Sequence, residues 1–194
     1  MRYCILFGIF LFVNIAFGQV YDIVVDAHGT GDFNTIGEAI SSIPNNQEKR
    51  TLILVKNGVY QEKLIVSSSK TFVSIIGEDV NNVIITWSDY QGKDGMFGAD
   101  SYTLLAEGAD FYMENITVVN GYGPGAQAVA IRTTGDRQVF KNCVFKGHQD
   151  TYYAHKNRQY NFKCHIEGNT DFIYGDATAV FDSCNIHSIA GGQY

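Results

Sequence analysis

The chain has 194 residues, of which 45% are hydrophobic and 18% are charged, so it is long enough for one domain with a core and too apolar to be intrinsically disordered. Its formal net charge of −6 excludes the basic surface on which nonspecific nucleic-acid binding depends. The 20 glycines and only 2 prolines fit many short strands joined by tight turns.

The first element is a predicted signal peptide, residues 1–18. Arg2 provides a positive start, residues 5–15 are almost wholly apolar, and Ala16-Phe17-Gly18 places small residues at the two positions that signal peptidase reads. The apolar run is shorter than the ~20 residues of a transmembrane helix, although an uncleaved anchor is the alternative. We therefore expect a secreted protein, extracellular or periplasmic, whose domain starts near Gln19 and makes no contact with a membrane.

One short helix is predicted between Thr35 and Ile43. Thr35 and Glu38 have the spacing of a capping box, and apolar residues then recur at helical spacing until Pro44 ends the element. Because the predicted strands follow it, we expect this helix to cap the N-terminal end of the fold.

Short β-branched runs come next, separated by Gly, Asn, Asp and Ser. Each is predicted to be a strand, and together they cover residues 52–55, 64–66, 72–76 and 83–85. Residues 89–100 are polar and rich in glycine, so a loop is predicted there.

A repeat marks the second half of the chain. Three cysteines follow one another at intervals of 21 and 20 residues, and apolar residues hold matching positions around them. One row lies four residues before each cysteine and a second row lies two residues after it: Val139, Tyr160 and Val180, then Phe145, Ile166 and Ile186, with a weaker copy at Tyr112 and Val118. The alternation predicts strands with both rows on a buried face. Strands that recur in this way without crossover helices predict an all-β fold, a parallel β-helix over residues 19–194.

The cysteines themselves should form a ladder in such a fold. Strands on neighbouring coils lie about 4.8 Å apart, which is within the range that a disulfide spans between its Cα atoms. Either Cys164 and Cys184 are paired, which we favour, or Cys143, Cys164 and Cys184 are all free thiols.

The same interval applies to a set of polar residues. Gln127 precedes Gln149 by 22 residues, and Asp150 precedes Asp171 by 21, so these four should gather on one face of three coils. Repulsion between two close carboxylates raises one pKa and leaves the other group ionised, which supplies an acid and a nucleophile. Two amides beside them suit a developing oxyanion, so the set fits attack on an ester carbonyl. The alternative is a structural one, with amide ladders and turn aspartates.

Metal and cofactor sites are not expected. The histidines are scattered along the chain without the spacing of a metal motif, and we interpret all five as structural or solvated residues: His28, His148, His155, His165 and His187.

Five segments of the chain resemble the pectinesterase (pectin methylesterase) family of carbohydrate esterases, in the family's order and spacing. Residues 31–40 resemble the opening of the family, and the other four resemble its motifs: 55–62 resemble G-x-Y-x-E, 127–132 resemble Q-A-V-A-L, 147–153 resemble G-Y-Q-D-T-L-Y, and 171–175 resemble D-F-I-F-G. The last two differ from the family at His148 and Tyr174.

This resemblance implies a right-handed parallel β-helix that removes methyl esters from pectin and releases methanol and pectate. Asp171 would be the nucleophile, and Asp150 would protonate the departing methanol and then activate water. Gln127 and Gln149 would line the oxyanion site. Two tyrosines match positions that contact sugar rings in the family, although filling of the core is the alternative for both: Tyr153 and Tyr174.

One part of the family's pattern is not found. In the family an arginine, followed closely by a tryptophan, lies downstream of the D-F-I-F-G aspartate and orients it. The arginines and the tryptophan of this chain lie elsewhere: Arg132, Arg137, Arg158 and Trp87. We therefore expect the domain of residues 19–194 to be incomplete at its C-terminus, with an interior turn and strand at residues 191–194, and to be poorly active and prone to aggregation.

Three other functions stay open on this scaffold. They are an esterase for another acyl substrate, a pectate lyase, which would need a calcium cluster and a basic residue, and a non-catalytic solenoid that binds glycans. The expected partner is pectin (homogalacturonan), with a preference for heavily methylated stretches because the net charge of −6 repels these least. We expect a monomer that binds no nucleic acid.

Overall fold

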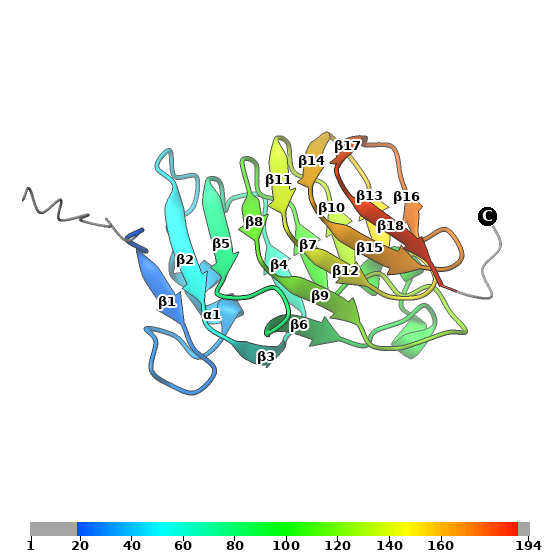
Figure 1. Ribbon diagram of the computed structural model, residues 1–194, viewed down its shortest axis with the longest axis horizontal. Coiled ribbons are helices and arrows are strands. Elements are labelled where there is room, and N and C mark those ends of the chain that lie inside the picture. Colours follow the sequence, from blue (N-terminus) through cyan, green and yellow to red (C-terminus); the bar gives the residue numbers. More distant parts are fainter. Residues whose placement is uncertain (1–18, 190–194) are drawn as a thin grey trace, which may run out of the picture.

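The computed structural model describes residues 19–189, which form a parallel β-helix of three sheets (Figure 1). The chain visits the sheets in turn, so each new coil adds a strand beside that of the coil before. The seven-stranded sheet runs in the order β1 (Ile23–Val25), β2 (Thr51–Val55), β5 (Val73–Gly77), β8 (Tyr112–Glu114), β11 (Gln138–Lys141), β14 (Arg158–Phe162) and β17 (Thr178–Asp182). The predicted all-β solenoid is thus confirmed.

The other two sheets complete each coil. The six-stranded sheet contains β3 (Gly58–Gln61), β6 (Val83–Trp87), β9 (Thr117–Asn120), β12 (Val144–Lys146), β15 (His165–Gly168) and β18 (Asn185–Ser188). The five-stranded sheet contains β4 (Leu64–Val66), β7 (Leu104–Ala106), β10 (Ile131–Thr133), β13 (Tyr152–Ala154) and β16 (Ile173–Tyr174). The predicted signal peptide and the turn expected at residues 191–194 lie outside the described residues.

The predicted repeat is the register of the sheets. Val139 pairs with Tyr160, which pairs with Val180, and Phe145 likewise pairs with Ile166 on the next coil. Every partner in these ladders is parallel, as expected for strands that succeed one another at a constant interval.

The prediction that both apolar rows are buried holds in the second row for Phe145 and Ile166 but not for Ile186, which is 49% exposed on the last described coil. For the first row the prediction was wrong. Tyr160 is 39% exposed and Val180 is 50% exposed, whereas Phe140, next to Val139, is fully buried. The cause is a left-handed residue between the two strands of each coil, for example Asn142 with φ of 49°. This residue turns the chain and shifts the inside–outside alternation by one position.

The predicted helix is α1 (Ile36–Ser42), and its N-cap is Thr35, whose hydroxyl accepts from the backbone N–H of Glu38. Glu62 also binds the N-terminal end of the helix. Its carboxylate accepts hydrogen bonds from the N–H groups of Ile36 and Gly37, at 2.9 and 2.8 Å. The helix packs against β1 and β4, which are edge strands of two of the three sheets at the N-terminal end of the solenoid (Figure 1). The expected capping role is therefore confirmed.

The interior is filled by stacked apolar side chains, including edge-to-face pairs of Phe140 with Phe145 and with Tyr152. The predicted cysteine ladder lies in this core, but the favoured Cys164–Cys184 disulfide is absent and all three thiols are free. In-register side chains on stacked strands point in parallel rather than toward one another, so each thiol contacts a backbone carbonyl of the preceding coil instead: Cys143 to Met113, Cys164 to Phe140 and Cys184 to Asn161, each at 3.4 Å.

The loop predicted at residues 89–100 is present and contains two short 3-10 helices, η1 (Lys93–Gly95) and η2 (Gly98–Asp100). Among residues 19–189 we find no helix with the length and apolar content needed to cross a membrane.

Candidate active site

The predicted site residues precede successive strands of the five-stranded sheet. Gln127 comes before β10, Gln149 and Asp150 come before β13, and Asp171 comes before β16. Gln127 and Gln149 form an isolated parallel bridge. The N–H of Asp150 donates to the carbonyl of Thr170 at 3.1 Å, which stacks Asp150 on the coil of Asp171. The structure thus brings all four residues together at one end of this sheet.

The two aspartates share a backbone conformation. Asp150 has φ of 67° and Asp171 has φ of 48°, both in the left-handed region that few residues other than glycine adopt. Asp tolerates this region better than most residues because its short side chain bonds locally. The two carboxyl groups therefore project from corresponding turns on neighbouring coils.

Burial distinguishes the two carboxyls. Asp150 is buried and its Oδ1 has no hydrogen-bond partner, whereas Asp171 is exposed. The pKa of Asp150 is raised to about 6. Burial raises it most and the charge of Asp171 adds to this rise, whereas hydrogen bonds from Tyr174 and Gln149 lower it. Asp150 therefore keeps its proton up to about pH 6, well above the range of an ordinary aspartate, beside an exposed carboxyl group on the next coil.

The two predicted sugar-contacting tyrosines stack on each other. The rings of Tyr153 and Tyr174 lie 4.4 Å apart and almost parallel, at 6°. Both are half-buried and point outward, whereas the neighbouring Tyr152 is fully buried in the core. The ring of Tyr152 therefore fills the core, whereas the rings of Tyr153 and Tyr174 do not. The hydroxyl of Tyr174 interacts with the carboxyl group of Asp150.

Sequence reasoning missed the part played by Arg132. Its guanidinium lies 5.4 Å from the ring centre of Tyr153 and within 3.2 Å of Nδ1 of His155. The same guanidinium donates to the carbonyl of Ala99 and to the carboxylate of Asp100, in the loop of residues 89–100. Arg132 thereby joins the aromatic stack to that loop. The other two arginines considered in the sequence, Arg137 and Arg158, pair with Asp110 and Asp136 beside the seven-stranded sheet instead.

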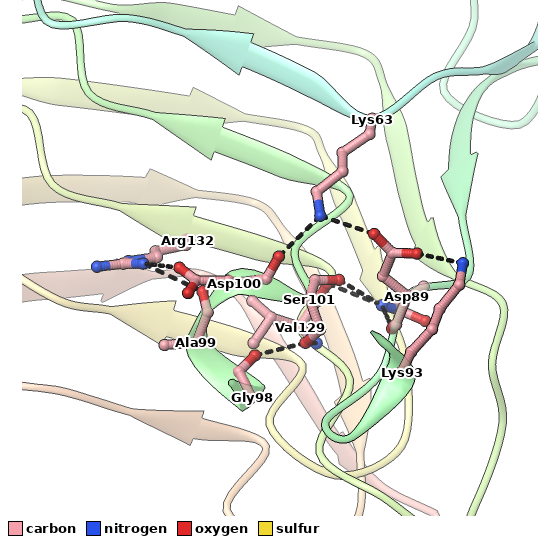
Figure 2. A network of polar contacts seen from close by, with 10 residues as sticks. Lys63, Asp89, Lys93, Gly98, Ala99, Asp100, Ser101, Val129 and Arg132 are labelled. Atoms are coloured by element: carbon pink, nitrogen blue, oxygen red, sulfur yellow. Dashed lines mark hydrogen bonds and ion pairs between the residues drawn. The ribbon is translucent and has the colours of Figure 1, made fainter. Parts of the chain in front are cut away.

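A polar network holds the loop against the coils (Figure 2). The buried carboxylate of Asp89 accepts from Nζ of Lys63 at 2.7 Å and of Lys93 at 2.6 Å, and these contacts hold its pKa below the usual range despite burial. Lys63 also donates to the carbonyl of Asp100. The side-chain amide of Asn120 donates to the carbonyls of Asp89, Ser101 and Val129, so it joins both ends of the loop to the strand region that carries the site.

The loop of residues 89–100 is in direct contact with Gln127. Gln91 donates its N–H to the carbonyl of Gln127 at 2.9 Å, and the buried Gly98 packs against the Gln127 side chain. No sequence pattern pointed to this contact, because it joins an irregular loop to a different coil.

No group of three possible metal ligands gathers at this site within residues 19–189. The one such group in that range lies on the six-stranded sheet and consists of His165, Glu167 and His187.

Comparison with known proteins places the fold in one family. A family model described as pectinesterase matches residues 22–193. The chain belongs to the pectinesterase family. Pectinesterase 31 of Arabidopsis thaliana is 38% identical over 180 residues, which are 87% of this chain and 56% of that relative. The resemblance read from the five motifs is thus confirmed.

Solved pectinesterase structures agree with this fold. A pectin methylesterase from carrot superposes with a TM-score of 0.85 at 37% identity, over 88% of this chain and 54% of that one. A pectin methylesterase from Erwinia chrysanthemi gives 0.80 at 31% identity, over 87% and 56%. This pectinesterase chain therefore spans about half the length of these three relatives.

Proposed function

We propose that this chain carries the site of a pectin methylesterase, which hydrolyses the methyl esters of galacturonate units and releases methanol and pectate. The observation that carries the proposal is the placement of buried Asp150 next to exposed Asp171, with the amides of Gln127 and Gln149 on the adjoining positions. Membership of the pectinesterase family supports the reaction, and the geometry supports the roles of the residues.

The first half of the reaction begins with Asp171. Its carboxylate attacks the carbonyl carbon of the methyl ester, and the amides of Gln127 and Gln149 donate to the oxygen that becomes negative. The tetrahedral intermediate then collapses and expels the methoxy group. Asp150, whose pKa of about 6 keeps it protonated at a higher pH than an ordinary aspartate, gives that proton to the leaving oxygen, so methanol departs and an anhydride joins the sugar to Asp171.

The second half uses the same residues in reverse. Asp150, now ionised, takes a proton from a water molecule, and the resulting hydroxide attacks the carbonyl carbon of the anhydride. The bond to Asp171 breaks, the galacturonic acid group is released and Asp150 is again protonated. The new acid group then loses its proton to water and becomes the carboxylate of pectate, so each turnover consumes one water molecule and releases one methanol and one proton.

The stacked rings of Tyr153 and Tyr174 face outward beside these carboxyls, which is where they would meet a sugar ring. One solved pectin methylesterase at 31% identity is in complex with a hexasaccharide. Pectin is an extracellular polymer, so the proposal includes secretion through the predicted signal peptide and action as a monomer on the polysaccharide.

The test is methanol release from methylated polygalacturonate by the purified full chain and its Asp171→Asn variant. We expect release to be abolished in Asp171→Asn and retained in Asp176→Asn, which changes an exposed carboxyl group five residues away on the same coil. Equal release by Asp171→Asn and the unaltered chain would remove Asp171 as nucleophile.

The same assay separates the other functions. Methanol from pectin but not from unrelated esters supports the proposal, whereas hydrolysis of a broad ester panel favours a different acyl substrate. An unsaturated product would indicate a lyase, and binding to pectin without any methanol would indicate a glycan-binding solenoid.

A further inference from the structure

Three polar side chains meet on the outer face of the six-stranded sheet. His165 and Glu167 lie two residues apart on β15, so the alternation of a strand directs both to the same face. His187 lies on β18 and is the register partner of Glu167 on the next coil. The side chains are 26%, 24% and 56% exposed for His165, Glu167 and His187, so all three can be reached from solvent.

Their ligand atoms are close enough to share one ion. Nε2 of His165 lies 2.9 Å from Oε2 of Glu167, and Nδ1 of His187 lies 3.9 Å from the same oxygen. The three atoms all lie within 4.8 Å of one another. In a tetrahedral zinc site with bonds of about 2.0 to 2.1 Å, ligand atoms are roughly 3.3 Å apart. The two distances to Oε2 of Glu167 bracket this value, so the three atoms are spaced closely enough to share one ion.

We propose that His165, Glu167 and His187 bind a zinc ion. Two imidazoles and one carboxylate are a ligand set for zinc and its neighbours among the divalent transition metals, whereas Mg²⁺ and Ca²⁺ prefer sites made of oxygen alone. The three protein ligands leave one position for water. Zinc binding displaces any protons on the two imidazoles and replaces the direct contact between His165 and Glu167 with bonds to the metal.

Neighbouring side chains both favour and oppose zinc binding at this site. Both imidazoles lie beside the same carboxylate oxygen of Glu167, which supports a position that one ion could share among the three side chains. Nζ of Lys146 lies 3.8 Å from the other oxygen of Glu167, so this cation competes with the metal for the carboxylate. The ligands belong to rigid, paired strands, which fixes their spacing before metal arrives.

Zinc at this place would join the coil of β15 to the coil of β18. An ion that binds the folded chain and not the unfolded one raises the free energy of unfolding in proportion to the logarithm of its concentration over its Kd. The site uses none of the residues assigned to ester hydrolysis, so its test does not depend on the proposed function.

The experiment titrates Zn²⁺ into the purified full chain and measures uptake by competition with a chromogenic zinc indicator, together with the thermal midpoint of unfolding. We expect one equivalent of zinc per chain and a thermal midpoint that rises with zinc. The double variant His165→Gln/His187→Gln should bind zinc at least about tenfold more weakly, and its midpoint should not respond. Glu167→Gln should weaken uptake as well, without the loss of either imidazole.

The matched control is His28→Gln, which removes an exposed histidine from the turn before α1 and should leave zinc uptake unchanged. Mg²⁺ should not compete. The absence of saturable uptake by the unaltered chain would overturn the proposal. Unchanged affinity in the double variant would overturn it too, because zinc would then be bound elsewhere, for example at the partly exposed thiol of Cys184.

Discussion

Gly98, in the loop of residues 89–100, is in direct contact with Gln127, which lies on a different coil. A β-carbon at residue 98 would lie 3.1 Å from Cβ of Gln127 and closer still to its Oε1. Only glycine leaves room for the Gln127 side chain in this position. Because the loop is anchored through Asp89 and Asn120, Gly98 is part of the structure that sets where the Gln127 amide points.

The first prediction follows from this contact. Gly98→Ala should displace the Gln127 amide and lower kcat for methanol release by about tenfold to a hundredfold, with a smaller change in KM, because an oxyanion donor acts mainly in the transition state. Steady-state kinetics on methylated polygalacturonate measure both constants. Gly121→Ala is the control, since a β-carbon there would have no neighbour closer than 3.6 Å. Equal loss in both variants would contradict the specific role of Gly98.

The second prediction concerns stability and pH. The pKa of Asp150 is raised to about 6 in the folded chain, against about 3.9 in an unfolded one, so the folded chain binds more protons between those two values. The contribution of Asp150 to the free energy of unfolding therefore falls as the pH rises from about 4 to about 6, by up to ~3 kcal/mol. Above that interval the contribution stays constant.

Denaturant unfolding of the chain and of Asp150→Asn at several pH values measures this contribution. The difference between the two is needed because other carboxyls with lowered pKa, such as Asp89, change stability in the opposite direction. We expect the unaltered chain to lose stability relative to Asp150→Asn as the pH rises. A constant difference across the interval would show that Asp150 titrates as an ordinary carboxyl group.

The third prediction separates the two stacked tyrosines. Tyr174→Phe removes the hydroxyl that hydrogen-bonds Asp150 and lowers its pKa, so the pKa of Asp150 should rise further in this variant. Tyr153→Phe keeps the same aromatic stack and removes a hydroxyl that has no such role, so it should leave the pKa of Asp150 near about 6. Carboxyl ¹³C chemical shifts followed through a pH titration report the value directly. A pKa that falls or stays constant in Tyr174→Phe would disprove the assignment.

The fourth prediction concerns the helix at the N-terminal end. Glu62→Ala removes the carboxylate that accepts from the N–H groups of Ile36 and Gly37, and should lower the free energy of unfolding by about 1 to 2 kcal/mol. Urea unfolding followed by circular dichroism measures the change. Glu48→Ala, which alters an exposed glutamate just before β2, should change stability by less than about 0.5 kcal/mol. A similar loss in both variants would mean that Glu62 does not hold the helix.

Most of the fold could be predicted because the length of one coil appears in the sequence as a repeat of constant length. The spacing of Cys143, Cys164 and Cys184 matches the sheet register, and Thr35 is the observed N-cap of the helix. Strands with few β-branched residues were missed, such as β7 and β16, since each is short and takes its hydrogen bonds from neighbouring coils. The outward direction of Val139 was missed because a left-handed turn residue resets the alternation.

The site was predicted in part for the same reason. Gln127, Gln149, Asp150 and Asp171 recur at the coil interval, so counting residues was enough to stack them. Arg132 and Gly98 were missed, because their partners lie in the loop of residues 89–100, where no period applies. The ligands proposed for zinc do follow the coil interval, since Glu167 and His187 are register partners, but no metal-binding motif marks them.

The sequence by itself determined which residues lie next to one another along the solenoid axis, since a constant coil length turns a spacing of about 21 residues into the stacking of Asp150 on the coil of Asp171. Only the tertiary structure decided which of the two carboxyls is buried, which amide the loop holds in place and whether stacked thiols are bonded. Burial, electrostatics and side-chain direction depend on which residues pack together across the coils. Many of these residues come from irregular segments, so their positions in the sequence do not predict their contacts.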